Sequence, residues 1–343
     1  MNKLIKVAVI GSTGYVGLEL VKLLSKHINV KIIFLGSDNL NIKSLSQVRD
    51  ITEFKNLPDL QPNSSFKVSD VDYLFLALPH QVSNKFVKLY YDKLKIIDLS
   101  ADFRFDNYNI YKKFYGDNHQ CIEYLQNFVY ALPEFYRKEI ASSHNFAIPG
   151  CYPTSILLPL IPLLKENLIE DKNIIIDSKS GYSGAGKNFN LDNIKSNSDY
   201  NFYNYNTNSH RHIPEIKQEL EKFSNNKKSI NFLFNPHILP NFRGMMSTIY
   251  CNLKNNLTVE EVNRVYSKFE QMNPFFKIVD KEERLDFFSV QNTNYCKIKV
   301  FNDTQDQKLI IVSVIDNLIK GAAGQAVQCL NIAESFQETE ALL

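Results

Sequence analysis

The sequence predicts an α/β protein whose first domain is built on a parallel sheet and whose second is an α+β domain with a mostly antiparallel sheet. Three observations support this prediction. Short apolar strands alternate with helical segments up to about residue 150, which is typical of a parallel sheet. From about residue 230 the chain becomes rich in longer strands. A chain of 343 residues is also long for one domain and comfortable for two.

The domain boundary is predicted near residue 150. Residues 1–150, completed by a C-terminal helix in residues 318–343, would form the first domain, and residues 151–317 the second. Two stretches lack a clear pattern. We expect irregular structure over residues 107–127 and a long loop over residues 188–208.

A glycine-rich turn connects the first predicted strand, Lys6–Ile10, to a helix with apolar residues at helical spacing. Glycines suit such a turn because a pyrophosphate must approach the backbone closely at the helix N-terminus. The spacing is G-x-x-G-x-x-G rather than G-x-G-x-x-G, and a plain tight turn is the alternative. With strand and helix in place, the turn favours a Rossmann-like dinucleotide site. Its predicted contacts are Gly11, Ser12, Thr13, Gly14, Tyr15, Val16 and Gly17.

The residues after the second predicted strand, Val30–Leu35, are expected to meet the adenosine ribose. Ser37 offers a hydroxyl there, and Asp38 a carboxylate that would bind a ribose 2′-hydroxyl and repel a 2′-phosphate. Lys43 lies nearby and would oppose that repulsion. The alternative is that Asp38 points to solvent, so the local residues leave NADP and NAD both open.

Two further candidates follow predicted strands of the first domain, at the edge where open α/β sheets bind ligands. Pro79 follows one strand and is a predicted cofactor contact. The polar stretch from Ser100 to Arg104 follows the next. Arg104 is a candidate for binding phosphate or carboxylate, because a guanidinium group can bind either through two hydrogen bonds. The alternative is a surface arginine paired with Asp102 or Asp106.

Cys151 follows a Pro149-Gly150 turn and precedes the apolar run Ile156–Leu164, which predicts a buried helix starting at the cysteine. Backbone N–H groups and the positive end of the dipole at a helix start favour a thiolate. The thiolate is the nucleophilic form, so Cys151 is a candidate covalent catalyst. The alternative is a small, inert, buried side chain.

A loop of small residues after another predicted strand ends in Lys187. Such a loop indicates anion binding through backbone N–H groups, although its spacing is not that of a P-loop. We expect Ser183 and Gly184 to contact the cofactor and Lys187 to contact the substrate.

A dense set of acid/base and anion-binding groups opens the helix predicted after residue 209: His210, Arg211, His212 and Glu215. The two histidines are candidate metal ligands, but no third His or Cys stands beside them, so we predict no metal site. General acid/base work is favoured, with a structural role for whichever histidine is idle.

Charge and cysteine usage argue against several classes of protein. A formal net charge of +2 indicates neither nucleic-acid nor membrane-surface binding. Five scattered cysteines without a C-x-x-C pair argue against a disulfide framework and for a cytoplasmic protein. The sequence shows no signal-peptide pattern, and its longest apolar run is interrupted by Pro159 and Pro162, so no membrane helix is predicted.

Six of these stretches occur together and in order, and in this they resemble the N-acetyl-gamma-glutamyl-phosphate reductases of arginine biosynthesis, relatives of aspartate-semialdehyde dehydrogenase. The resemblance covers nearly the whole chain. The matching stretches are Gly11–Gly17, Ser100–Arg104, Pro149–Thr154, Ser180–Lys187, His210–Ile216 and Lys320–Gln328.

The resemblance implies that NADPH reduces an acyl phosphate through a thioester on Cys151, with His212 as the acid/base group. It also implies that the second domain's sheet joins protomers into a homodimer or homotetramer. The resemblance further implies that His210, Arg211 and Glu215 support His212 or bind the substrate. It implies that Arg104 and Lys187 bind phosphate or carboxylate, and that Gln325 contacts the nicotinamide amide.

Two departures from the family pattern stand out. Ile148 replaces the usual Asn before Pro-Gly-Cys, and Asp38 replaces a basic or hydroxyl residue, which bears on the NADP preference. Three alternative functions also remain open: reduction of another acyl phosphate of aspartyl or aminoadipyl type, a cysteine hydrolase or acyltransferase without hydride transfer, and a dinucleotide-binding regulator. The glycine turn with Gln325 argues against the hydrolase, and Cys151 with His212 argues against the regulator.

Overall fold

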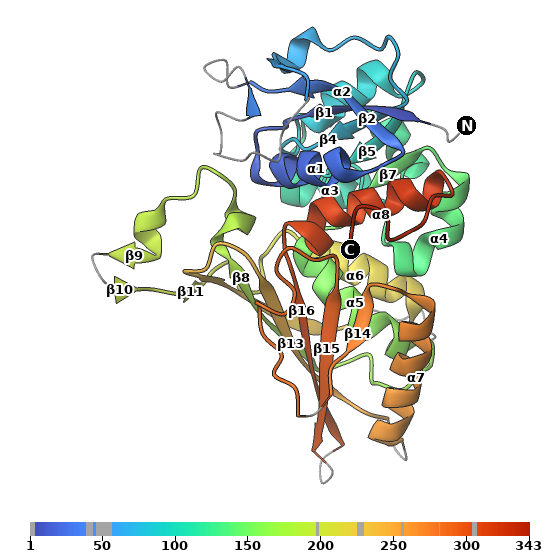
Figure 1. Cartoon of the computed structure of the whole chain (residues 1–343). Helices are drawn as coiled ribbons and strands as arrows, with labels where there is room; N and C mark the ends of the chain where they lie inside the picture. Colours follow the sequence, from blue (N-terminus) through green and yellow to red (C-terminus); the bar gives the residue numbers. More distant parts are fainter. Residues whose placement is uncertain are drawn as a thin grey trace. The chain divides into compact units, whose positions relative to one another are not determined.

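The structure, a computed structural model, describes residues 4–38, 44–45, 57–196, 199–224, 230–254, 257–280, 282–303 and 307–343. The chain forms two compact units (Figure 1). Unit 1 comprises Met1–Pro149 and Ala322–Leu343, and unit 2 comprises Gly150–Gly321.

Unit 1 is built on a sheet of seven described strands in the order β3-β2-β1-β4-β5-β7-β6, and every neighbouring pair is parallel. The predicted parallel sheet is therefore confirmed. Its strands are Ile5–Ile10 (β1), Val30–Gly36 (β2), Leu60–Gln61 (β3), Tyr73–Leu76 (β4), Lys95–Asp98 (β5), Val129–Tyr130 (β6) and Asn145–Ala147 (β7). Its helices are Tyr15–Lys26 (α1), Ser83–Tyr90 (α2), Tyr108–Tyr115 (α3), Pro133–Ser142 (α4) and Gly324–Ala333 (α8).

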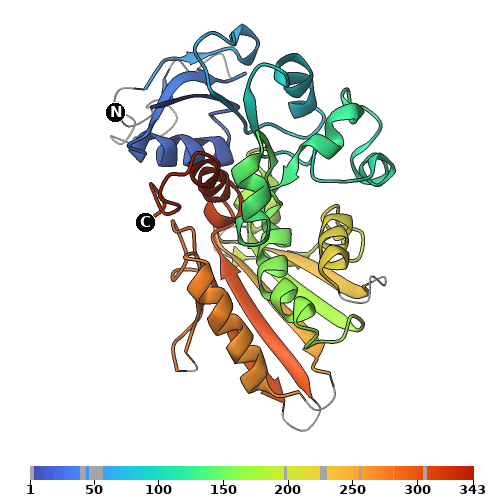
Figure 2. The same cartoon turned by 90° about the vertical axis from the view of Figure 1, so that its right-hand side faces the viewer.

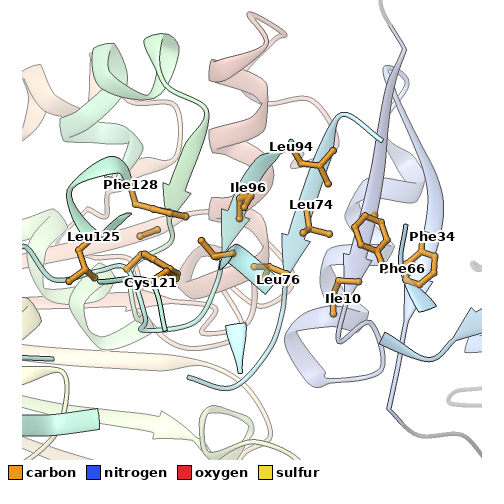
Figure 3. Close-up of a cluster of buried hydrophobic side chains, with 14 residues drawn as sticks. Ile10, Phe34, Phe66, Leu74, Leu76, Leu94, Ile96, Cys121, Leu125 and Phe128 are labelled. Atoms are coloured by element: carbon orange, nitrogen blue, oxygen red, sulfur yellow. The ribbon is translucent and has the colours of Figure 1, made fainter. Parts of the chain in front are cut away.

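The core of unit 1 is a continuous apolar cluster, part of which is shown in Figure 3. Ile10, Leu74 and Ile96 come from the adjacent strands β1, β4 and β5 and are fully buried. Phe66 lies toward one end of the cluster and Phe128 toward the other. Continuous burial of the strands explains why they read as short apolar runs rather than as alternating patterns.

The C-terminal helix α8 packs within unit 1, against α1 and α4. The side chain of Asn331 pairs with His27 Nε2 at 2.7 Å. Just after the helix, Glu334 accepts hydrogen bonds from Tyr73 and Lys95, each at 2.6 Å. The helix ends at Ala333, because Ser335 adopts a left-handed conformation with φ +58°, a common way to stop a helix.

Unit 2 is built on a second sheet of seven described strands in the order β11-β12-β8-β13-β16-β15-β14. The pairs β12–β8 and β14–β15 are parallel and the other four are antiparallel, so the prediction of a mostly antiparallel sheet is confirmed. The strands are Ile174–Gly181 (β8), Tyr203–Asn204 (β11), Phe232–Leu239 (β12), Met245–Asn252 (β13), Phe276–Ile278 (β14), Cys296–Asp303 (β15) and Lys308–Ile315 (β16).

Three helices pack on one face of this sheet, as Figure 2 shows: Cys151–Lys165 (α5), Ile213–Phe223 (α6) and Val259–Met272 (α7). Side chains on the strands alternate between this covered face and the opposite one. On the opposite face, one row of apolar residues crosses five strands in register. We call it the apolar row, and it consists of Leu233, Ile175, Tyr250, Ile310 and Phe301.

The predicted buried helix after Cys151 is confirmed, and it runs through both of its internal prolines. Proline removes a backbone donor from the helix, which normally leaves the helix kinked or broken. Tyr266 donates a 2.8 Å hydrogen bond to the carbonyl of Pro159, so α7 supports α5 at this point. Among the described residues, no helix is both long enough and apolar enough to cross a membrane.

The expectation of irregular structure over residues 107–127 was wrong, whereas the described part of residues 188–208 is a loop whose elements are only two or three residues long. Residues 107–127 contain α3 and a 3-10 helix, Ile122–Asn127 (η3). Asn107 caps α3 by accepting from the N–H of Asn109, and Tyr111 and Tyr115 are buried in it with their rings stacked. Residues 188–208 contain short elements: Leu191–Asn193 (η5), Lys195–Ser196 (β9), Asp199–Tyr200 (β10) and Tyr203–Asn204 (β11).

Candidate active site

Cys151 is the first residue of α5, and Gly150 is its N-cap. All five cysteines lie in described residues as reduced thiols, and Cys151 is partly exposed whereas the other four are buried. Burial raises the pKa of Cys121 and of Cys251 to about 12. Cys151 therefore combines access to reagents with a place at the positive end of a helix dipole, which favours its thiolate.

A buried hydrogen bond joins the starts of α5 and α6. The N–H of Gly150 donates to Glu215 Oε1 at 2.9 Å, and Glu215 is fully buried in the first turn of α6. His212 is the N-cap residue of the same helix. The residue preceding Cys151 is thus tied to the turn that follows His212. The two partners are 65 positions apart, so the sequence motif alone did not predict this bond.

The two histidines of the motif lie side by side and are both buried. Their ring centroids are 4.8 Å apart, and the N–H of His212 donates to His210 Nδ1 at 3.0 Å. Burial and the nearby Arg211 charge lower the pKa of His210 to about 4. His210 is therefore a neutral imidazole at physiological pH.

Two tyrosines surround the histidines. The ring of Tyr152 is 5.3 Å from that of His210 and 6.0 Å from that of His212. The hydroxyl of Tyr205 lies 3.2 Å from the hydroxyl of Tyr152 and 3.4 Å from His210 Nε2. Tyr152 immediately follows Cys151, so this aromatic cluster connects the histidines to the start of α5.

Gly321 lies directly against Cys151. A Cβ built on Gly321 would stand 2.7 Å from Cys151 Cβ, far inside contact distance. A side chain at position 321 would therefore displace Cys151, which explains the glycine.

The remaining predicted residues of unit 2 lie at its surface or in a nearby turn. Lys187 and Arg211 are exposed cations. Ser183 and Gly184 lie in the 3-10 turn Tyr182–Ala185 (η4), where Ser183 Oγ accepts from Asn317 at 2.9 Å. Asn317 also accepts from the N–H of Gly244, so this turn is held by a buried amide that the sequence analysis did not single out.

In unit 1, the glycine-rich turn has the tight geometry that a dinucleotide site requires. Gly11 has φ +79°, and a Cβ on it would stand 2.4 Å from the carbonyl oxygen of Ala77. A Cβ on Gly17 would stand 2.2 Å from the carbonyl oxygen of Gly11. Ser12 Oγ donates to the carbonyl of Gly36, and α1 begins directly after Gly14. The turn is thus tightly folded at a helix N-terminus, a geometry that fits a pyrophosphate.

The ribose end of this predicted site is bounded by hydroxyl groups. Ser37 follows β2 and its Oγ lies 2.9 Å from Thr13 Oγ1, which links it to the glycine-rich turn. Asp38 is exposed. Lys43 lies outside the described residues.

Arg104 is buried, so the alternative of a surface arginine was wrong. Its Nε donates to the carbonyl of Ile148 at 2.7 Å, and its guanidinium also donates to the carbonyl of Leu99 at 3.0 Å. Arg104 therefore holds together the chain segments that follow β5 and β7. Ile148, the residue that departs from the family pattern, is bound through its backbone.

Asp102 organises the same edge of the sheet. It is fully buried and accepts from the N–H groups of Gln81 and Asn84 and from the hydroxyl of Tyr111. The loop that it fixes begins at Pro79, whose carbonyl accepts from the N–H of Val82. The sequence analysis weighed Asp102 only as a partner for Arg104. Its position after a parallel strand was the feature of the sequence that could have indicated its role at this edge.

Gln325 is buried in the first turn of α8, within unit 1. Unit 1 thus contains the glycine-rich turn, Ser37, Pro79, Arg104 and Gln325, whereas unit 2 brings together Cys151, His210, His212 and Glu215. Within the described residues, no group of three His, Cys, Asp or Glu side chains is placed to hold a metal ion.

Comparison with known proteins places both units in one family. Residues 6–143 match the family model of the semialdehyde dehydrogenase NAD binding domain, and residues 151–317 match that of the semialdehyde dehydrogenase dimerisation domain. Among solved structures, the chain resembles aspartate semialdehyde dehydrogenase II of Vibrio cholerae with a TM-score of 0.74 and 18% identity, over 96% of this chain and 98% of that one. This similarity supports the fold.

Sequence relatives are more specific. An N-acetyl-gamma-glutamyl-phosphate reductase of Ehrlichia canis is 42% identical over 100% of this chain and 98% of its own length. A probable chloroplastic N-acetyl-gamma-glutamyl-phosphate reductase of Arabidopsis thaliana is 39% identical over 100% of this chain and 85% of its own. One from Thermoanaerobacter pseudethanolicus is 40% identical over 99% of this chain and 98% of its own. The chain therefore belongs to the N-acetyl-gamma-glutamyl-phosphate reductase family of the semialdehyde dehydrogenases.

Proposed function

We propose that this protein reduces N-acetyl-gamma-glutamyl phosphate to N-acetylglutamate 5-semialdehyde and phosphate, a step of arginine biosynthesis. Full-length relatives at about 40% identity support this reaction. The observation that carries it is the buried Gly150–Glu215 bond, which joins the helix start bearing Cys151 to the helix start bearing His212. A nucleophile beside a general base is what acyl transfer through a covalent intermediate needs.

In the first half-reaction, His212 takes the proton of the Cys151 thiol. The thiolate attacks the acyl carbon, forming a C–S bond and an oxyanion. Backbone N–H groups at the start of α5 stabilise that negative charge. The C–O bond to phosphate then breaks, phosphate leaves with the electron pair and accepts the proton from His212, and a thioester remains on Cys151.

In the second half-reaction, the thioester carbon is reduced and the C–S bond breaks. A bound nicotinamide dinucleotide supplies the hydride for this reduction. The start of α5 again stabilises the oxyanion on the reduced carbon. When the carbonyl re-forms, Cys151 leaves as a thiolate, which a solvent proton returns to its resting state, and the semialdehyde is released.

Charged residues around this chemistry fit an anionic substrate. Arg211 directly precedes His212 and is exposed, and Lys187 is a second exposed cation of unit 2. We assign both to the substrate's phosphate or carboxylate. Arg104 is a third candidate for an anionic group, with its guanidinium already oriented by two carbonyl groups.

Unit 1 matches a dinucleotide-binding domain, and we propose NADP as its preferred cofactor. The glycine-rich turn would hold the pyrophosphate, and the hydroxyls of Thr13 and Ser37 would meet the ribose. Asp38 is exposed and so is free to turn away from a 2′-phosphate. NAD is the alternative, and it would be preferred if the Asp38 carboxylate faced the 2′-phosphate instead of solvent.

We further propose that the protein is a homodimer or homotetramer joined through the apolar row. Residues 151–317 match a dimerisation domain. Four of the five side chains in the row are 41–51% exposed, on the sheet face opposite the three helices. An exposed apolar row of this extent favours association with a second copy. We also propose a cytoplasmic location, because five scattered cysteines without a C-x-x-C pair suit a reducing compartment.

The decisive experiment runs the reaction in reverse with purified protein. NADP and NAD are offered with phosphate and a panel of semialdehydes. We expect phosphate-dependent NADP reduction with N-acetylglutamate semialdehyde and at least a tenfold lower kcat/KM with aspartate semialdehyde, a difference of about 1.4 kcal/mol. Preference for another semialdehyde would redirect the substrate assignment. Ester or thioester hydrolysis without any dinucleotide reduction would establish the cysteine hydrolase instead.

A further inference from the structure

Both ring nitrogens of His210 face groups of the protein. Nδ1 lies 3.0 Å from the backbone nitrogen of His212, and Nε2 lies 3.4 Å from the hydroxyl of Tyr205. The side chain is 6% exposed. A histidine that binds substrate needs at least one nitrogen directed at the ligand, so this environment indicates a different role.

In the chain of hydrogen bonds around His210, each group donates to the next. A backbone N–H can only donate, so Nδ1 of His210 accepts from His212 and carries no proton. A neutral imidazole then keeps its proton on Nε2, which donates to Tyr205. The hydroxyl of Tyr205 donates to Tyr152, and the hydroxyl of Tyr152 donates to the carbonyl of His237 at 3.3 Å.

The side chains in this chain of hydrogen bonds keep their protons near neutral pH. Burial and the charge of Arg211 lower the pKa of His210 to about 4, and burial raises the pKa of Tyr205 to about 12. Burial raises the pKa of Tyr152 as well. The direction of donation in this hydrogen-bond chain, set by the His212 N–H, is therefore kept near neutral pH.

We propose that His210 is a positioning residue that fixes the backbone at His212 and thereby aims the His212 imidazole at the start of α5. Tyr152 follows Cys151 in α5, so the hydrogen bonds through Tyr205 connect His210 to the helix that carries the nucleophile. The inference rests on the proposed function, in which Cys151 and His212 act as a pair. Of the two roles that the resemblance implied for His210, it favours support of His212 over contact with the substrate.

Two substitutions at position 210 separate these roles. In His210→Asn, the amide oxygen can occupy the place of Nδ1 and accept from the His212 N–H. His210→Leu has a similar size and offers no acceptor. Tyr205→Phe removes the hydroxyl that accepts from His210 Nε2. Its matched control is Tyr200→Phe, at an exposed tyrosine of the same segment. His212→Asn serves as the reference for complete loss of the His212 imidazole.

The first measurement is the rate of Cys151 alkylation by iodoacetamide as a function of pH, without cofactor or substrate. The second is kcat and KM with the acyl phosphate. We expect His210→Leu to shift the alkylation profile in the direction of His212→Asn. We also expect its kcat to fall about tenfold, as for loss of an ordinary hydrogen bond, with little change in KM. His210→Asn and Tyr200→Phe should stay near wild type, with Tyr205→Phe between.

Several outcomes would overturn the inference. A wild-type alkylation profile in His210→Leu, together with an altered one in His212→Asn, would leave the proposed pair standing and remove the positioning role. A rise in KM at constant kcat in both His210 variants would make His210 a substrate ligand. An unchanged profile in His212→Asn would instead count against the pair itself. If His210→Leu does not fold, the comparison of Tyr205→Phe with Tyr200→Phe decides.

Discussion

Cys151 differs from the other four cysteines in being partly exposed at a helix start. We expect Cys151→Ser to lose at least about 10³-fold in turnover, because a serine hydroxyl is far less nucleophilic at neutral pH, while dinucleotide binding is retained. Peptide mapping after brief iodoacetamide treatment should find Cys151 labelled first, since burial holds the pKa of Cys121 and Cys251 near 12. Faster labelling of Cys121 with full activity would disprove its role.

His212 is expected to contribute as a general acid/base. His212→Asn should lower kcat by about 10²–10⁴-fold, the usual contribution of such a group. Steady-state kinetics on this variant and on His210→Asn test the assignment, since His210→Asn keeps an acceptor for the His212 N–H and should be much milder. If His210→Asn proves the more damaging change, the two roles are reversed.

The cofactor preference tests whether the Asp38 carboxylate faces the ribose or points to solvent. A carboxylate close to a 2′-phosphate would cost about 1–3 kcal/mol, or roughly 5- to 150-fold in NADPH affinity. Because Asp38 is exposed, we expect wild type to prefer NADPH and Asp38→Ser to change that preference little. Titration of NADPH and NADH against both proteins measures this. A wild type that prefers NADH, with a gain for NADPH in Asp38→Ser, would show that the local carboxylate decides.

At the scale of residues, the sequence placed the candidate residues in their helices and turns better than it predicted their contacts. The Pro149-Gly150 turn before an apolar run was enough to place Cys151 at a helix start. The bond from Gly150 to Glu215 spans 65 positions, and the donors around Asp102 come from two separate segments. Such contacts depend on tertiary packing, which local patterns do not encode.

At the scale of single elements, the start of α7 offers a clean test. Thr258 and Glu261 form a capping box, in which Glu261 Oε2 accepts from the N–H of Thr258 at 2.8 Å. Thr258→Ala should lower the free energy of unfolding by about 1 kcal/mol, as measured by urea denaturation. Thr258→Ser keeps the hydroxyl and should stay close to wild type. Equal losses in both variants would mean that the methyl group, rather than the cap, matters.

This capping box was predictable because all of its partners lie within four residues. The helix α3 was not, because Tyr111 and Tyr115 are stabilised there by ring stacking and burial rather than by strong helix propensity. The short strand β11 was missed for a similar reason. Its two residues become a strand only by pairing with β12, which lies more than 25 positions further along the chain.

At the scale of the whole molecule, the apolar row predicts how copies of the chain associate. Tyr250 occupies the middle of the row, and its cross-strand neighbour is Ile175. Tyr250→Glu would bury a charge in the proposed interface, so we expect the mass found by light scattering to fall to that of a monomer. Tyr200→Glu, at an exposed tyrosine outside the row, should leave the mass unchanged. A monomeric wild type, or an unaltered Tyr250→Glu, would contradict this interface.

The return of residues 322–343 to unit 1 affects the order in which the protein can fold as it is synthesised. A nascent chain leaves the ribosome from its N-terminal end, and domains generally fold as units. His27 and Tyr73 emerge early, but their partners Asn331 and Glu334 lie 304 and 261 positions further along the chain. Residues 150–321 form a continuous segment and can complete their own contacts sooner. We therefore expect the unit that carries Cys151 to reach its native state first, although its translation begins second.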